Sequence, residues 1–264
     1  MTWPTGRFNN WAEFTSFASG FRFGDPITFA NLLRGQPDAS WPIKSSLSRL
    51  ISPGTNEDAA LQIEAGLLRE FKSHVRNHLS GALIPSDEST IEWWALMAHH
   101  GAPTRLIDWS GSPYVAAYFA AIQCPDRDGA IWVIHPHSLL EALGQAVGRD
   151  TPLDPLAEKA GGPKLVTPVL ATRKTERMIA QQGQFTIGLN ILTDQESAID
   201  NVLKTAAAQR GECLHMKMIV PRALKPEFLD QLRGMNVTAN ALFPGIDGLG
   251  RSLAELARIA FERA

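Results

Sequence analysis

The 264-residue sequence has little cysteine, no long hydrophobic run and almost no surplus of charge. Its two cysteines, Cys124 and Cys213, are far apart and belong to no paired-cysteine motif, which argues against a disulfide framework and a cysteine zinc site. Because no run of 18 apolar residues and no signal-peptide pattern occurs, we expect a cytoplasmic protein without a membrane partner. Lys plus Arg (25) and Asp plus Glu (27) nearly balance, and a net charge of −2 argues against a purely electrostatic nucleic-acid binder.

Four common catalytic signatures are also missing: a GxxxxGK phosphate loop, GxGxxG after a strand, HExxH and GxSxG. Their absence argues against the usual NTPases, dinucleotide oxidoreductases, zinc proteases and serine hydrolases. The chain does contain 44% hydrophobic and 20% charged residues, the balance of an ordinary folded protein. Because single cores stop growing near roughly 250 to 300 residues, we predict one domain over 1–264, with an N-terminal helical part at about 1–25 and a core at about 26–264.

Hydrophobic periodicity predicts helices distributed unevenly among six strands. Apolar residues recur at steps of three and four from Asp58 to Leu79, and capping patterns start further helices at Ser89 and Ser112. The remaining helices are expected at about 194–209, 226–232 and 250–263, and the strands at 27–34, 104–109, 129–135, 164–170, 184–189 and 213–220. Helices do not alternate one per strand, so an α+β fold is favoured over a doubly wound parallel sheet. Residues 149–163, with Pro, Gly and charged residues, are expected to form a mobile surface loop.

Two short segments carry polar residues that secondary structure does not require. In residues 33–36 (LRGQ), the arginine ends an apolar strand and can present its planar fork to an anion, while the glycine permits close approach by a ligand. In residues 99–110 (HHGAPTRLIDWS), histidine, arginine and aspartate lie between a helix end and an apolar strand. Burial of such groups without partners costs on the order of several kcal/mol. They therefore pair with one another or face a cleft.

A structural interpretation of the same residues remains open. Arg105 and Asp108 can form an internal salt bridge, His99 can cap carbonyls at its helix end, and residues 181–183 can simply turn the chain into a strand. We favour the structural interpretation for Arg105. For Arg34, His99 and Asp108 we favour a functional one, because separate polar motifs would otherwise all be structural by coincidence.

Taken together, these motifs resemble the FRG domain family, which is called after a Phe-Arg-Gly tripeptide. The resemblance is carried by residues 33–36 with Trp41 and Arg49, 94–119 (WALMAHHGAPTRLIDWSGSPYVAAYF), 128–129, 177–185 (RMIAQQGQF) and 243–248 (FPGIDG). Three positions depart from the family pattern: Leu33 replaces Phe, Ala98 replaces a common Gln, and Ser110 replaces a common Thr. Only Ala98 removes a possible polar contact to a ligand.

The order of the motifs is also similar to that of the ADP-ribosyltransferase fold, whose enzymes cleave the nicotinamide glycosidic bond of NAD and transfer ADP-ribose. This resemblance implies mixed or antiparallel sheets forming a split β core flanked by helices. It also implies NAD as the substrate and Arg34 as the residue that grips the dinucleotide. Ser110 or Ser112 would be the second-motif serine, and Gln181, or less well Glu176, would take the late acidic or amide position.

The resemblance gives the following candidate site residues. Arg34, His99, Asp108 and Gln181 are expected to be catalytic, and Arg34, Gly35, Gln36, Thr104, Arg105, Ser110 and Ser112 are expected to bind the nucleotide. An uncharged Gln181 cannot serve as a general base, so His99, Asp108 or Glu176 would have to activate the acceptor. A cationic stretch is a candidate guide for a phosphate-bearing acceptor and comprises Lys164, Arg173, Lys174 and Arg177.

Three functions are compatible with these motifs. The first is an NAD-dependent ADP-ribosyltransferase-like enzyme acting on a protein or nucleic-acid acceptor, as a bacterial toxin or phage-defence effector. The second is a non-catalytic module that binds a nucleotide or a partner in the same cleft. The third, a metal-dependent hydrolase using His99, His100 and Asp108, ranks last because adjacent histidines lack the i, i+4 ligand spacing, and no metal site is predicted.

Overall fold

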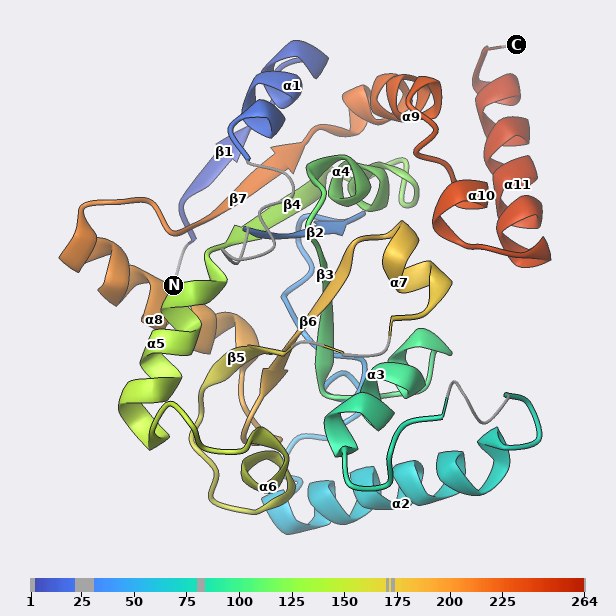
Figure 1. Cartoon of the computed structure of the whole chain (residues 1–264). Coiled ribbons are helices and arrows are strands. Elements are labelled where there is room, and N and C mark those ends of the chain that lie inside the picture. Colours follow the sequence, from blue (N-terminus) through green and yellow to red (C-terminus); the bar gives the residue numbers. More distant parts are fainter. Residues whose placement is uncertain (1–2, 22–30, 80–83, 170, 172–173, 264) are drawn as a thin grey trace.

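The computed structural model describes residues 3–21, 31–79, 84–169, 171 and 174–263. Within them, eleven α-helices surround one seven-stranded mixed sheet (Figure 1). The strands are β1 (Thr5–Arg7), β2 (Leu32–Gln36), β3 (Leu106–Ser110), β4 (Gly129–Ile134), β5 (Val166–Val169), β6 (Gly183–Gly188) and β7 (His215–Val220). The helices are α1 (Trp11–Ser19), α2 (Glu57–Val75), α3 (Thr90–His99), α4 (Pro113–Ala121), α5 (Pro136–Val147), α6 (Leu153–Glu158), α7 (Glu176–Ala180), α8 (Gln195–Arg210), α9 (Lys225–Gly234), α10 (Ala239–Leu242) and α11 (Ile246–Arg263).

The strand order β1-β7-β4-β2-β3-β6-β5 contains one parallel pair, β1 with β7, and five antiparallel pairs. All residues of β2 pair with β4, and all residues of β3 pair with β6. Among the described residues, in contrast, β2 and β3 are joined only through Leu33 and Ser110. The sheet therefore consists of two well-paired groups of strands that touch at one residue pair and diverge beyond it (Figure 1).

The expected mixture of helices with a mixed, mainly antiparallel sheet is confirmed. The expectation of more than one sheet is wrong, because the Leu33–Ser110 pair makes the strands continuous. The strand expected at 27–34 lies partly outside the described residues, and its described part is shifted towards the C-terminus, as β2. The N-terminal part contains β1 as well as α1, and the short β1 was not predicted because three residues carry too little periodicity.

The segment 149–163 is not the mobile loop that its composition indicated. It contains α6, whose Asp154 side chain accepts a hydrogen bond from the backbone N–H of Ile91 at 2.8 Å. Ala157 of the same helix is fully buried in a core cluster that it shares with α3, β3 and β6. These tertiary contacts hold a segment whose sequence alone has weak helix signals.

Hydrophobic layers cover both faces of the sheet. On one face, α4 packs over β2 and β4 together with an aromatic group formed by Phe8, Phe14 and Phe228. On the other face, α5 and α8 cover the strands through residues such as Leu139 and Leu203. β4 is buried at all six positions, as expected for a central strand. This packing fixes β2 and β3 at the middle of the molecule.

Gly35 is the position where α4 comes closest to β2. A Cβ atom built on Gly35 would lie 1.9 Å from the carbonyl oxygen of Ala116 and 2.7 Å from the backbone nitrogen of Ala120. The absence of a side chain therefore allows α4 to lie directly on the strand. The glycine was expected to admit a ligand; it permits the close approach of this helix and also lines the cavity described below.

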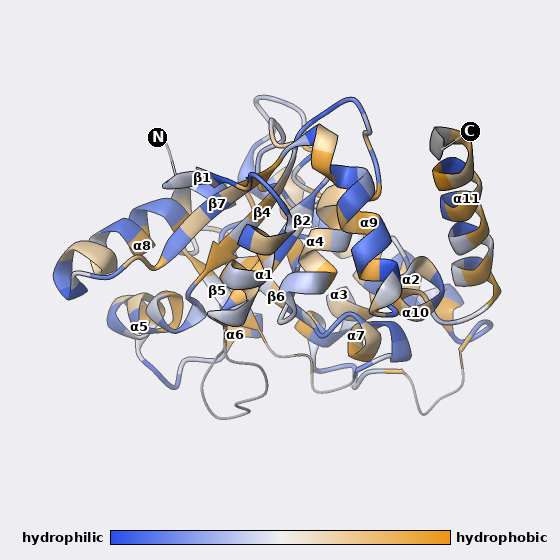
Figure 2. Ribbon diagram, turned by 90° about the horizontal axis from the view of Figure 1, so that it is seen from above, coloured by the Kyte–Doolittle hydropathy of each residue, from blue (hydrophilic) through white to orange (hydrophobic). Residues whose placement is uncertain are grey.

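The C-terminal helix α11 lies at one end of the molecule, away from the sheet, in both views (Figures 1 and 2). It contacts α10 and carries exposed hydrophobic residues that include Ile246, Leu253 and Phe261. In the described part of the chain, none of the helices combines the length and the apolar character that a bilayer crossing requires.

Candidate functional site

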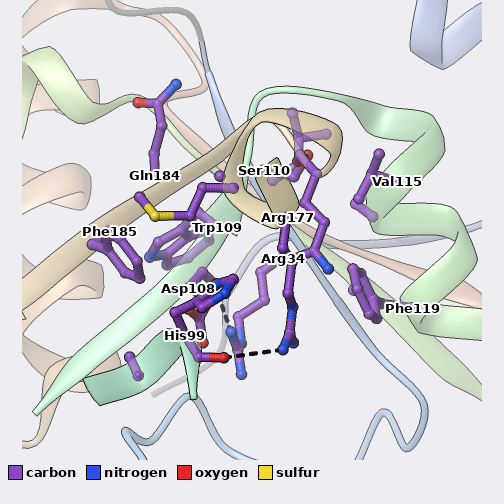
Figure 3. A pocket seen from close by; sticks show the side chains of 17 residues that line it. Arg34, His99, Asp108, Trp109, Ser110, Val115, Phe119, Arg177, Gln184 and Phe185 are labelled. Atoms are coloured by element: carbon purple, nitrogen blue, oxygen red, sulfur yellow. Dashed lines mark hydrogen bonds between the residues drawn. The ribbon is translucent and has the colours of Figure 1, made fainter. Parts of the chain in front are cut away.

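A cavity of about 210 Å³ opens where β2 and β3 diverge. Its walls come from β2, α3, β3, α4, α7 and β6, so the divergence of the two strand groups creates it. Figure 3 shows the side chains that line it, among them Arg34, His99, Asp108, Phe119 and Arg177. The side containing α4 is apolar, whereas the side between β2 and α7 carries charge.

Arg34 crosses the opening between the strands. Its Nη1 donates a hydrogen bond to the backbone carbonyl of Asp108 at 2.5 Å, and its buried Nε has no hydrogen-bond partner among the described residues. Burial lowers the pKa of the Arg34 guanidinium, while the charge of Asp108 acts in the opposite direction. An arginine remains protonated at neutral pH because its ordinary pKa lies far above neutrality. A charged donor with unused hydrogen-bonding capacity therefore lies at the cavity wall.

Arg177 reaches the same cavity from α7. Its Nη1 donates to the carbonyl of His99 at 3.2 Å, and its guanidinium lies 4.7 Å from the centre of the Phe243 ring. Burial lowers the pKa of Arg177, and the Asp108 carboxylate again opposes the shift. In Figure 3 the Arg34 and Arg177 side chains extend towards the part of the cavity that contains His99 and Asp108.

Asp108 supplies the carboxylate of the site. It is the exposed residue in the middle of β3, whose other four positions are buried. Within the described residues its carboxylate makes no ion pair shorter than 4 Å, although its charge acts on both Arg34 and Arg177. The arrangement is therefore a free carboxylate flanked by two guanidinium groups.

His99 ends α3 beside Arg177. Its Nδ1 lies 2.9 Å from the hydroxyl oxygen of Thr175, and its carbonyl is the one that accepts from Arg177. Burial, then the neighbouring His100 and the charge of Arg177, lower the pKa of His99 to about 4. The imidazole is consequently neutral at neutral pH and adds no positive charge to the cavity.

Arg105 lies outside the cavity and has a structural role. It is only 1% exposed, donates from Nε and Nη2 to both carboxylate oxygens of Glu64, and donates from Nη1 to the carbonyls of Ala157 and Leu189 at 2.8 and 3.1 Å. Its guanidinium also lies 4.8 Å from the centre of the Trp94 ring. The structural interpretation that we favoured thus agrees with its surroundings, but its partner is Glu64 and not Asp108.

Gln36, Thr104 and Ser112 use their side chains within the fold. Gln36 accepts from the indole N–H of Trp132 at 2.5 Å and donates to a backbone carbonyl. Thr104 is fully buried, and its hydroxyl accepts a backbone N–H hydrogen bond. Ser112 caps α4 by accepting from the N–H of Val115. None of these three side chains belongs to the wall of the cavity between β2 and β3.

Ser110 and Gln181 line the cavity, but their side chains form hydrogen bonds with backbone groups of the protein. The Ser110 hydroxyl donates to the carbonyl of Gln181 at 2.7 Å and accepts from the N–H of Ser112 at 2.9 Å. The Gln181 side chain donates to the carbonyl of Leu242 at 3.0 Å. Glu176, the alternative late residue, is exposed at the start of α7 and does not line the cavity.

Arg177 is the site residue that the sequence did not single out. It was considered only as part of a cationic stretch, of which Arg173 lies outside the described residues, while Lys164 and Lys174 are exposed and do not line the cavity. The available signal was its position at the start of the RMIAQQGQF segment, directly before β6. Because β6 pairs with β3, that segment is brought beside Asp108.

Two further cavities share walls with this one. A small cavity of about 110 Å³ shares Arg34, Ala98 and Asp108 with it and adds the cationic side chains of Lys44 and Arg49. Ala98 thus lines both cavities. A larger cavity of about 550 Å³ lies on the Arg177 side.

No curated protein and no solved structure matches the chain. The FRG domain family model, in contrast, matches residues 30–128. This range contains Arg34, His99 and Asp108, whereas Arg177 and Gln181 follow it. The chain is therefore similar to the FRG domain over residues 30–128, and these residues supply β2, α3, β3 and α4 to the walls of the cavity.

Proposed function

We propose that the cavity between β2 and β3 binds NAD and that the protein is an ADP-ribosyltransferase-like enzyme. The observation that carries this proposal is the free carboxylate of Asp108 between the guanidinium groups of Arg34 and Arg177, in a cavity with one apolar wall. NAD combines the features that such a surface recognises: a diphosphate, ribose hydroxyls and a flat aromatic ring.

The two arginines are suited to the phosphates. A guanidinium binds phosphate through two parallel N–H donors, and such charge-assisted hydrogen bonds are about twice as strong as neutral ones. Among the described residues Arg34 makes a hydrogen bond through Nη1 alone, so other donors of its guanidinium remain for a phosphate oxygen. Arg177 is held by its stacking on Phe243 and by the His99 carbonyl, which fixes its direction before a ligand arrives.

The size of the cavity determines which part of the ligand it holds. Its volume of about 210 Å³ lies below the roughly 300 to 1,000 Å³ typical of small-molecule sites, so it suits the nicotinamide and its ribose and not the whole dinucleotide. The adjoining small cavity, with Lys44 and Arg49, offers further cationic surface on the far side of Arg34. The remainder of the dinucleotide would extend in that direction.

Transfer requires the bond between C1′ of the ribose and the nicotinamide nitrogen to break. The bonding electrons leave with nicotinamide, which becomes neutral, and positive charge develops on the ribose as in glycoside hydrolysis. The Asp108 carboxylate would stabilise that charge and accept the proton that the attacking acceptor oxygen or nitrogen releases. Gln181 cannot do this, because an amide carries no charge and its N–H already donates to Leu242.

A second function, a nucleotide-binding module without catalysis, is favoured by one specific observation. Ser110 and Gln181, two of the residues expected to contact NAD, direct their side-chain hydrogen bonds into the protein. Binding would then depend on the arginines alone. For the hydrolase alternative, the described residues contain no group of three His, Cys, Asp or Glu side chains placed to hold a metal ion.

The experiment that separates the first two functions is release of nicotinamide from NAD by the purified protein. We expect saturable release that Asp108→Asn lowers by roughly 100-fold or more, the usual loss when a group that stabilises transition-state charge is removed. Arg69→Met, which changes an exposed arginine on α2, should leave release unchanged. NAD binding without release would favour the binding module, and release that Asp108→Asn does not affect would contradict the proposed mechanism.

A further inference from the structure

We propose that the larger cavity beside Arg177 binds a nucleotide unit of a single-stranded nucleic acid. Its role as the acceptor site rests on the proposed transferase function, whereas the binding itself does not. The cavity, of about 550 Å³, shares Gly35, Phe119 and Arg177 with the proposed NAD cavity. A ligand in it would therefore lie beside the proposed NAD cavity, which contains Asp108, with these three residues as the common wall.

Three arginines give this cavity its positive charge. Arg177 and Arg251 lie on the ring of Phe243, with guanidinium carbons 4.7 and 4.4 Å from the ring centre. Arg258, from the next turns of α11, donates to the carbonyl of Ile122 at 2.8 Å and lines the same cavity. The three guanidinium groups thus come from α7 and α11, and the Phe243 ring holds two of them in fixed directions.

The acidic residue in this cavity is already neutralised. Glu255 is the carboxylate among the described lining residues; it accepts a hydrogen bond from the Tyr118 hydroxyl and lies 3.7 Å from Arg233. Burial and the nearby Glu255 raise the pKa of Tyr118, so this hydroxyl keeps its proton. Arg177 and Arg251 have no carboxylate within 4 Å in the described part of the chain. The cavity consequently has a net positive charge although the whole chain is slightly acidic.

The other side of the cavity is apolar and aromatic. Phe119 and Ile122 of α4 and its C-terminal end lie there, beside Phe243. Guanidinium groups next to apolar and aromatic surface are the combination that binds single-stranded nucleic acid, because phosphates contact the cations and bases pack on the apolar surface. A phosphorylated serine would fill the cationic side only. We therefore assign the site to a nucleotide and not to a phosphopeptide.

The test is fluorescence anisotropy of a 5′-labelled single-stranded DNA or RNA decamer, titrated with the full-length protein. Arg251→Glu should weaken binding at least 10-fold and reduce the slope of log K against log salt concentration by about 1 or more, because a phosphate contact is lost. Arg69→Glu makes the same charge change on the exposed face of α2 and should leave binding unchanged. Arg251 is exposed, so the variant should fold, and its unfolding temperature is measured alongside.

Binding of NAD is measured on the same Arg251→Glu protein. Retained NAD binding with lost decamer binding supports a separate nucleic-acid site beside the NAD cavity. Lost decamer binding in a protein that never binds NAD still supports the nucleic-acid site and removes only the transferase role. The proposal is overturned if Arg251→Glu binds the decamer as the unchanged protein does, if ADP-ribose displaces the decamer competitively, or if a phosphoserine peptide binds as tightly as the decamer.

Discussion

Arg34 and Arg105 both lie beside the centre of the sheet, at β2 and just before β3, yet their hydrogen bonds differ completely. Arg105 uses Nε, Nη1 and Nη2 to bind Glu64 and two backbone carbonyls, and it is almost fully buried. Within the part of the chain that the structure describes, Arg34 makes one hydrogen bond to the Asp108 carbonyl and leaves its buried Nε without a partner. The difference indicates that Arg105 holds α2 and α6 to the sheet, whereas the unused donors of Arg34 agree with the proposal that it binds a ligand.

The largest effect is expected at Arg105. Arg105→Met leaves the Glu64 carboxylate buried without its counter-ion, and breaking such a pair costs about 3–5 kcal/mol of unfolding free energy. Urea unfolding followed by circular dichroism measures this loss. In the double variant Arg105→Met with Glu64→Leu much of it should be recovered, because no buried charge remains. If the unfolding free energy of the single variant fell by less than about 1 kcal/mol, Arg105 would not differ from Arg34 in its contribution to stability.

Gly35 tests how firmly the strand that carries Arg34 is held. In Gly35→Ala the new Cβ meets the Ala116 carbonyl at 1.9 Å, so α4 must move, and overpacking of this kind typically costs about 1–3 kcal/mol. The matched control is Gly66→Ala in α2, where no atom lies within 4 Å of the new Cβ and the alanine should stabilise the helix by about 0.5–1 kcal/mol. Thermal unfolding of both variants gives the comparison; equal stabilities would show that α4 does not depend on direct contact with β2.

The His99 side of the cavity should respond to pH. With a native pKa of about 4 against an ordinary value of 6.5, the unfolded chain binds a proton on His99 that the folded protein does not bind between these values. The contribution of neutral His99 to stability is thus present above pH 6.5 and is lost as the pH falls from 6.5 to 4. His99→Gln should lose less stability over this interval, although His100, His135 and His215, whose pKa values are also lowered, keep part of the dependence.

Unfolding temperatures of the two proteins from pH 7 to pH 4 measure this difference. An identical decline of the unfolding temperature in both proteins would show that the burial of His99 beside Arg177 does not contribute to the pH dependence of stability.

The smallest effect on stability is expected at Arg34. Arg34→Met removes one hydrogen bond but also a buried N–H without a partner, so the unfolding free energy should change by less than about 1 kcal/mol. The same urea titration used for Arg105 measures it. A loss near that of Arg105→Met would make Arg34 a structural residue.

Local sequence patterns were sufficient to predict much of the fold. The cap at Ser112, the periodic helix after Asp58 and the wholly apolar strand β4 depend on neighbours in sequence, and all three occur in the structure. The segment 149–163 was misjudged because α6 is held by contacts from Ile91 and Arg105, which no local pattern encodes.

The candidate site could be predicted from the sequence only in part, for the same physical reason. Arg34, His99 and Asp108 were identified because their polarity conflicts with their apolar surroundings in sequence. The partner of Arg105 is 41 residues away in α2, and Arg177 approaches through the pairing of β6 with β3, so both follow from the strand order and not from local composition. The sheet order also decides that β2 and β3 diverge, which creates the cavity.

The most direct test of the account is calorimetric titration of NAD into the unchanged protein, Arg34→Met and Arg69→Met. We predict saturable binding to the unchanged protein and to Arg69→Met, and affinity weakened by about 10-fold or more in a fully folded Arg34→Met, because charge-assisted hydrogen bonds contribute about 1.5–3 kcal/mol. No NAD binding by the unchanged protein, or equal binding by Arg34→Met, would contradict the proposal that Arg34 binds a ligand of this kind.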